Sequence, residues 1–147
     1  MSIIALLQMD ATVGDLNGNA NRLSLLAQQA HDEGATIGVS TELAVCGYPP
    51  RDLLLEQDFI QHSLDVALNI RVPIPLLVGT PIPPQADRSL PTNGVIRCGP
   101  DVASITADKS SRVVAQKQLL PTYDVFDEAR YFAAENRSGL ARSIGGM

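Results

Sequence analysis

Short continuous hydrophobic runs alternate with helical stripes through the first half of the chain. Residues 2–9 are almost entirely apolar, which is typical of a strand covered on both faces. Gly14 and Asp15 then supply a turn and a capping side chain, and Gly34 stands where a helix C-cap belongs. Between them, apolar residues recur at spacings of four and three, as on one face of a helix. These positions are Leu16, Ala20, Leu23, Ala27 and Ala30.

The same alternation continues to about residue 79. Residues 35–40 predict a second buried strand, and residues 47–50, Gly-Tyr-Pro-Pro, cannot continue regular structure because proline lacks an amide donor. A helix is expected from about residue 52 to 69, where Pro73 and Pro75 follow, and residues 76–79 predict another short buried strand. The apolar face of this second helix consists of Ile60, Leu64, Ala67 and Leu68.

The second half has a different pattern. Residues 80–92 contain four prolines and few apolar residues, which predicts a surface loop. Residues 93–98, 102–106 and 112–116 are short β-favouring runs separated by turn residues, which predicts an antiparallel meander. Strand–helix–strand order followed by a meander indicates an α/β fold: one mixed sheet with helices on one face.

Composition and charge narrow the classes of function. The formal net charge of −5 and the scattered basic residues argue against nucleic acid as a partner. The apolar start of the chain is too short for a membrane span. Two cysteines, Cys46 and Cys98, do not make a disulfide framework, so a cytoplasmic protein is expected. They also lack metal-ligand spacing, and His31 and His62 are far apart in sequence, so no metal site is predicted.

Two segments carry the specific signal. Residues 40–54 are Ser-Thr-Glu-Leu-Ala-Val-Cys-Gly-Tyr-Pro-Pro-Arg-Asp-Leu-Leu, and residues 116–132 are Gln-Lys-Gln-Leu-Leu-Pro-Thr-Tyr-Asp-Val-Phe-Asp-Glu-Ala-Arg-Tyr-Phe. Together they resemble the glutamine-hydrolysing, nitrilase-type domain of glutamine-dependent NAD synthetases. The resemblance implies a four-layer α-β-β-α sandwich, of which residues 1–147 would form roughly the first half, an incomplete carbon–nitrogen hydrolase domain.

The resemblance also implies roles for four residues. Glu42 and Lys117 match the family's catalytic glutamate and lysine, a base and a stabiliser of the oxyanion. Glu128 is in the region where a second glutamate orients the lysine and substrate; the alternative is a loop ion pair with Arg130. Tyr123 stands where the family presents an aromatic residue to glutamine, although it could simply pack over the loop. We expect Glu42 and Lys117 to lie within salt-bridge reach, with the other two bordering the same cleft.

The family's cysteine nucleophile lies further downstream than these 147 residues reach. Cys46 is a weak substitute, because a lone cysteine is usually a small buried hydrophobe. The resemblance therefore implies the glutaminase portion of an NAD synthetase that needs no cofactor of its own. Its expected partners are L-glutamine and an ATP- and Mg²⁺-using synthetase domain that accepts ammonia, and the full-length form would be a homo-oligomer. The alternatives are an inactive remnant or interaction module of the same fold, and another carbon–nitrogen amide hydrolase.

Overall fold

The computed structural model describes residues 1–85, 88–100, 112–124 and 126–135. Their first half is a strand–helix–strand–helix–strand series: β1 (Ile4–Leu7), α1 (Leu16–Asp32), β2 (Ile37–Ser40), α2 (Gln57–Leu68) and β3 (Leu76–Ile82). β4 (Thr92–Cys98) and β5 (Val113–Gln116) complete a sheet of five strands in the order β1-β2-β3-β4-β5. Two short 3₁₀ helices are also present: η1 (Arg51–Leu55) lies between β2 and α2, and η4 (Glu128–Arg130) follows β5.

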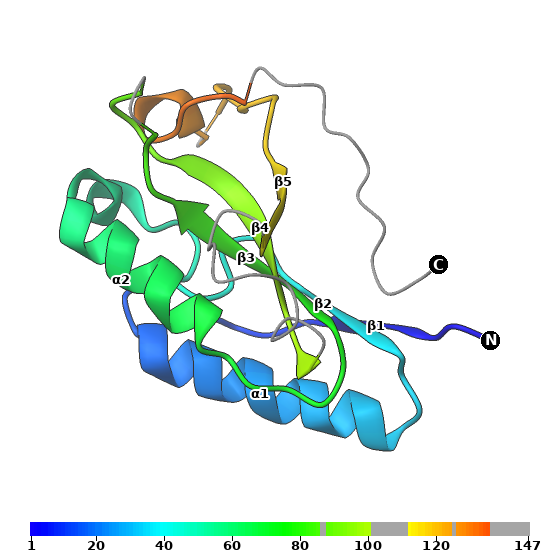
Figure 1. The fold of residues 1–147 in the computed structure, drawn as a ribbon. Helices are drawn as coiled ribbons and strands as arrows, with labels where there is room; N and C mark the ends of the chain where they lie inside the picture. The colour runs from blue at the N-terminus through cyan, green and yellow to red at the C-terminus, as the bar shows by residue number, and fades with distance from the viewer. Residues whose placement is uncertain (86–87, 101–111, 125, 136–147) are drawn as a thin grey trace.

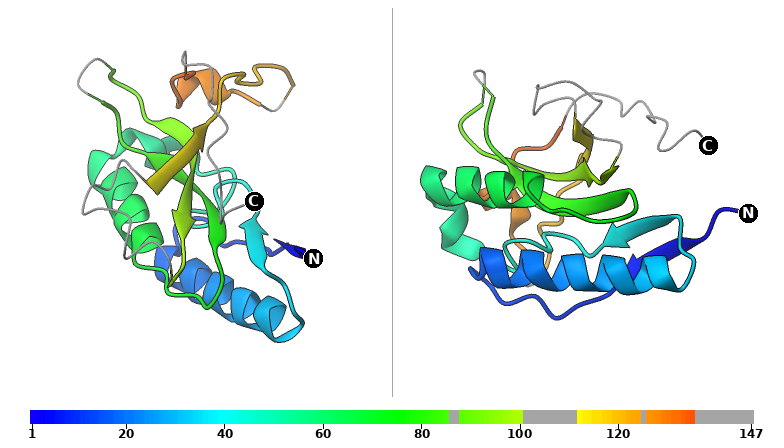
Figure 2. Two further views of the ribbon diagram at one scale, coloured as in Figure 1. Left: turned by 45° about the vertical axis from the view of Figure 1, so that its right-hand side comes forward. Right: turned by 60° about the horizontal axis from the view of Figure 1, so that its bottom comes forward.

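Both helices lie on one face of this sheet (Figures 1 and 2). β1, β2 and β3 are parallel, while β4 and β5 are antiparallel to their neighbours. Crossovers between parallel strands are right-handed. Since β1, β2 and β3 are adjacent in chain order, two such crossovers place α1 and α2 on the same side. The predicted mixed sheet with helices on one face is confirmed, and it supplies one helical and one sheet layer.

Helix α1 has the predicted ends and the predicted buried stripe. The Asp15 side chain accepts a hydrogen bond from the Gly18 amide at 3.0 Å, which caps the first turn. Gly34 has a φ of 89°, the left-handed conformation that follows many helices. All five predicted stripe positions are buried, together with Asn19. The helix therefore attaches to the sheet by a narrow row of leucines and alanines.

The other face of the sheet is open among the described residues. Strand register places Leu6, Val39 and Leu77 side by side on this face, and the side chain of Leu6 is 79% exposed. The expectation that the first strand is covered on both faces is wrong, because β1 is an edge strand and the helices cover only the opposite side. Ile4, on the same open face, is also exposed.

Two boundaries differ from the sequence prediction. The second helix begins at Gln57 and not near residue 52, because Glu56 has extended backbone (ψ 108°) and separates α2 from η1. The expected loop from residue 80 is also wrong at both ends, because β3 continues through Pro81 to Ile82 and β4 begins at Thr92. Proline is tolerated there because the β2–β3 ladder ends at Leu77, so no β2 partner requires its missing amide.

The meander is confirmed where the structure describes it. β3 pairs with β4 over seven residues, and β4 pairs with β5 with a register shift between Val95 and Ile96. The strand expected at residues 102–106 lies outside the described residues. Within the described ranges, no helix has the length and apolar character needed to cross a membrane.

The loop that follows β2 is buried, and Asn19 fixes it to helix α1. The Asn19 side chain donates to the carbonyls of Thr12 at 2.7 Å and Val45 at 3.0 Å, and accepts from the Thr12 amide at 2.9 Å. Asn19 is 1% exposed, so water cannot replace these bonds. One amide side chain therefore joins the start of α1 to two loops.

We predict that Asn19→Ala lowers the free energy of unfolding by about 3 kcal/mol, because it leaves buried backbone groups without partners. Urea denaturation followed by circular dichroism measures this. Asn21→Ala, an exposed position on the same helix, is the matched control and should change stability little. Equal effects from the two substitutions would contradict the assigned role of Asn19.

We predict that the isolated chain associates with itself through the open sheet face, because exposed apolar patches and unpaired strand edges favour association. Size-exclusion chromatography with light scattering over a concentration series tests this. Leu6→Glu should shift the population toward monomer, whereas Leu25→Glu, at an exposed leucine of α1, should not. A strict monomer at every concentration would show that the chain closes its own core.

Candidate active site

Glu42 lies just beyond the carboxyl end of β2, on a loop packed against β3. Gly79 permits this approach: a Cβ there would lie 2.7 Å from the Leu43 amide nitrogen and 2.7 Å from the Thr41 carbonyl oxygen. The Gly79 amide in turn donates to the Ser40 hydroxyl at 3.0 Å. Leu43 is fully buried and has a φ of 49°, a left-handed conformation that is uncommon for leucine. The backbone on both sides of Glu42 is therefore held by the core.

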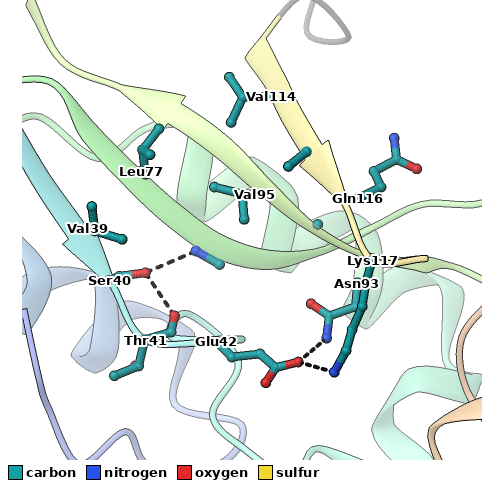
Figure 3. Close-up of a pocket in the computed structure, with 13 residues that line it drawn as sticks. Val39, Ser40, Thr41, Glu42, Leu77, Asn93, Val95, Val114, Gln116 and Lys117 are labelled. Carbon is teal, nitrogen blue, oxygen red and sulfur yellow. Dashed lines mark hydrogen bonds and ion pairs between the residues drawn. The ribbon is translucent and has the colours of Figure 1, made fainter. Parts of the chain in front are cut away.

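Lys117 follows β5 directly and reaches the same end of the sheet. Its Nζ lies 2.9 Å from Oε1 of Glu42, across 75 residues of sequence (Figure 3). The predicted approach of these two residues is therefore confirmed. The Lys117 amide also donates to the Asn93 carbonyl at 2.8 Å, which continues the β4–β5 pairing to the residue that bears the ammonium group.

Glu128 makes the second ion pair of Lys117. Its Oε1 and Oε2 lie 3.0 and 2.8 Å from Nζ. The residue sits in η4, and its side chain is 7% exposed, compared with 47% for Glu42. The structure thus pairs Glu128 with Lys117, while Arg130 lies over the ring of Tyr131. A buried carboxylate needs such a partner, because an unpaired buried charge is costly.

The two carboxylates keep Lys117 charged. Partial burial lowers the pKa of its ammonium group, but hydrogen bonds to Glu128 and Glu42, and their negative charges, outweigh burial and leave the pKa raised. An ammonium group has three N–H donors. They face three carboxylate oxygens: Oε1 of Glu42 at 2.9 Å, and Oε1 and Oε2 of Glu128 at 3.0 and 2.8 Å. The ammonium group is therefore held by both carboxylates.

The charged groups border a cleft on the open face of the sheet. Its volume is about 610 Å³. Glu42, Asn93 and Lys117 lie at one end, and the floor is apolar, formed by strand residues (Figure 3). The principal apolar residues are Val39, Leu77, Val95 and Val114. Cleft and charges together suit a small polar molecule whose reactive group meets one ammonium and one carboxylate.

Glu128 borders a second, adjacent cleft. It has a volume of about 650 Å³ and includes Tyr48, Arg51 and Phe126. The Tyr48 hydroxyl is 3.5 Å from Oε1 of Glu128. Burial and the negative charges of Glu128 and Glu42 raise the pKa of Tyr48, so its hydroxyl stays protonated and can donate. Lys117 therefore stands between the two clefts, paired with one carboxylate from each.

Sequence reasoning missed two residues of this cluster, Tyr48 and Asn93. Tyr48 is part of the Gly-Tyr-Pro-Pro segment six residues after Glu42, so the motif itself was the available signal. Asn93 offered a weaker one, a polar residue near the start of a β-favouring run. Its amide lies 2.6 Å from Oε1 of Glu42.

Tyr123 does not line either cleft. Its side chain is 70% exposed, and its ring packs edge-on against Phe126 with centroids 5.8 Å apart. The structure brings Glu42, Lys117 and Glu128 together and leaves Tyr123 at the surface. The expectation that Glu128 and Tyr123 border the cleft of Glu42 and Lys117 is wrong, because Glu128 borders the second cleft and the ring of Tyr123 packs outside both. A role for Tyr123 in contacting glutamine stays a prediction.

Neither cysteine is available to the clefts. Cys46 and Cys98 are both fully buried, and burial raises the pKa of their thiols to about 12 and about 11. The Cys46 thiol donates to the carbonyls of Leu43 and Gly47, and the Cys98 thiol to that of Ala67. Both residues thus pack as small hydrophobic side chains, as the sequence suggested for Cys46, and neither is placed to attack a bound amide.

Comparison with known proteins finds similarity to glutamine-dependent NAD(+) synthetases. No family model matches the chain. The glutamine-dependent NAD(+) synthetase of Synechocystis sp. is 38% identical over an alignment of 143 residues, which covers 94% of this chain and 25% of that protein. The chain thus spans about a quarter of the length of the curated relatives it matches.

Solved structures agree with the sequence comparison. The glutamine-dependent NAD+ synthetase of Acinetobacter baumannii superimposes with a TM-score of 0.69 at 26% identity, over 91% of this chain and 24% of that chain. An amidase of the nitrilase superfamily from Nesterenkonia has a TM-score of 0.62 at 22% identity, over 91% of this chain and 48% of that chain. The chain is therefore a homologue of the glutamine-dependent NAD synthetases, over about a quarter of their length, and has the fold of the nitrilase superfamily.

Proposed function

We propose that this chain supplies the base and the oxyanion stabiliser of a glutaminase, the ammonia-producing part of a glutamine-dependent NAD synthetase. One observation carries the proposal: Lys117 lies 2.9 Å from Glu42 and 2.8 Å from Glu128 at the end of a cleft. The homology to glutamine-dependent NAD synthetases supports glutamine as the substrate. Residues 1–147 would then be an incomplete carbon–nitrogen hydrolase domain.

Each charged group has a role in amide hydrolysis. Glu42, half-exposed beside the cleft, takes the proton of a cysteine thiol as the sulfur attacks the amide carbon. Lys117 donates an N–H to the oxyanion that forms on the carbonyl oxygen. Glu42 then returns the proton to the leaving nitrogen, and ammonia departs. Glu128 orients Lys117, and a contact of Tyr123 with the substrate would require its exposed side chain to change position.

The attacking cysteine thiol is not among the residues that line the two clefts. The sequence contains two cysteines, and both are buried in the core. We therefore propose that polypeptide in addition to these residues supplies the nucleophile, and that a synthetase domain receives the ammonia. A reducing, cytoplasmic setting fits the two free thiols.

We predict that the purified chain alone releases no ammonia from glutamine above background, because covalent catalysis requires a nucleophile in the cleft. An enzyme-coupled ammonia assay with the chain and with Cys46→Ser measures this. Glutaminase activity that Cys46→Ser abolishes would overturn the assignment and make Cys46 the nucleophile.

A chimera tests the site directly. This chain would replace the aligned segment of the Synechocystis protein, which supplies the rest of the polypeptide. We predict that the chimera hydrolyses glutamine and that Glu42→Gln lowers its kcat by about 10²- to 10⁴-fold, the range for loss of a general base. Lys117→Met should act similarly, and Lys117→Arg should restore part of the activity.

Glu33→Gln, at an exposed glutamate that ends α1, is the control and should leave activity unchanged. An active chimera that tolerates Glu42→Gln and Lys117→Met would refute the proposed roles. A folded but inactive chimera would favour an interaction module that has kept the fold without turnover.

A further inference from the structure

Asn93 contacts both halves of the proposed catalytic pair. Its side-chain amide donates to Oε1 of Glu42 at 2.6 Å, and its main-chain carbonyl accepts from the Lys117 amide at 2.8 Å. The residue stands near the start of β4, opposite Pro81 of β3, and is 5% exposed. One buried residue thus lies between two charged residues that are 75 positions apart.

The direction of the amide follows from the chemistry of its partner. An ionised carboxylate can only accept hydrogen bonds. The Nδ2 group of Asn93 must therefore face Glu42, because its Oδ1 would be repelled at 2.6 Å. A short bond to a charged acceptor is among the stronger hydrogen bonds in proteins. It restrains a side chain that is 47% exposed and would otherwise sample several rotamers.

The same bond distinguishes the two oxygens of Glu42. Oε1 accepts from both Asn93 and Lys117, whereas Oε2 has no partner among the described residues (Figure 3). We propose that Asn93 is a positioning residue of the site: it holds Oε1 against Lys117 and leaves Oε2 as the oxygen that accepts the proton. This inference rests on the proposed glutaminase function.

Substitution at Asn93 can separate its two contacts. Asn93→Ala removes the amide of the side chain and keeps the carbonyl that binds Lys117, so the β4–β5 pairing persists. Thr92→Val is the matched control: it removes one hydrogen bond from the neighbouring buried residue, that between Thr92 Oγ1 and Gln116 Oε1 at 2.9 Å, and does not touch Glu42.

The bond itself is tested in the full chain by ¹H–¹⁵N spectroscopy. The side-chain amide resonances of Asn93 are assigned by their loss in Asn93→Ala. We predict that one proton lies downfield of ordinary side-chain amides and returns to the ordinary region in Glu42→Gln, while Glu33→Gln leaves it in place. If the chemical shift of this proton does not change in Glu42→Gln, the inference is overturned, regardless of the results of the enzyme assays.

The positioning role is tested by the kinetics of the chimera described above. Asn93→Ala should lower kcat by up to about 100-fold with KM nearly unchanged, as expected when a reacting group is misplaced. Thr92→Val should leave both constants near those of the parent. If Glu42→Gln lowers kcat and Asn93→Ala does not, the inference about Asn93 fails and the proposed function stands. If neither substitution matters in an active chimera, the proposed function fails.

Discussion

Residues 43–47, directly after Glu42, are buried, so their backbone polar groups must find partners inside the protein. Leu43, Ala44, Val45 and Cys46 are all fully buried. The Gly14 amide donates to the Cys46 carbonyl at 2.9 Å, and the Gly47 amide to that of Leu43 at 2.9 Å. Asn19 binds the Val45 carbonyl, and the absent side chain at Gly79 makes room for the segment. The position of Glu42 therefore depends on hydrogen bonds within the core.

The ion-pair cluster is asymmetric, and this asymmetry suits chemistry better than stability. Exposed ion pairs add little to the free energy of folding. For a buried pair, the cost of removing the charges from water offsets much of their mutual attraction. Glu128 is almost completely buried, whereas Glu42 is half-exposed, and Lys117 lies between them. The buried pair fixes the ammonium group in place, while the exposed carboxylate stays accessible from the cleft.

Local sequence patterns predicted the elements whose formation depends mainly on neighbouring residues. Helix α1 has its cap, its stripe and its terminal glycine within one short stretch of sequence. The errors came where tertiary structure overrides local preference. Pro81 lies inside a strand because β2 has already ended beside it, and the apolar run of β1 has one exposed face because the helices cover only the other.

For the candidate site, the flanking motifs identified Glu42, Lys117 and Glu128, which the structure brings together. The distances between these residues along the sequence could not have identified them. Nor could they identify Asn93, which contacts Glu42 across 51 residues of sequence. Tyr123 shows that a motif can also mislead: its place in the second motif predicted a cleft residue, but its side chain lies at the surface. A short polar residue in a strand gives no sign of what it will face.

The large sequence separations within the cluster also bear on how the site forms. Its contacts join residues 51, 75 and 80 positions apart. Contacts between distant residues form only after the chain between them has lost much of its conformational freedom, and folding slows as such contacts come to dominate. Strands β3, β4 and β5 and the 3₁₀ helix η4, which carries Glu128, must be in place before Glu42 can contact Asn93 and Lys117 and before Lys117 can contact Glu128. During synthesis, Glu42 is therefore present in the nascent chain long before Lys117 and Glu128, the residues that it needs to form the charged cluster.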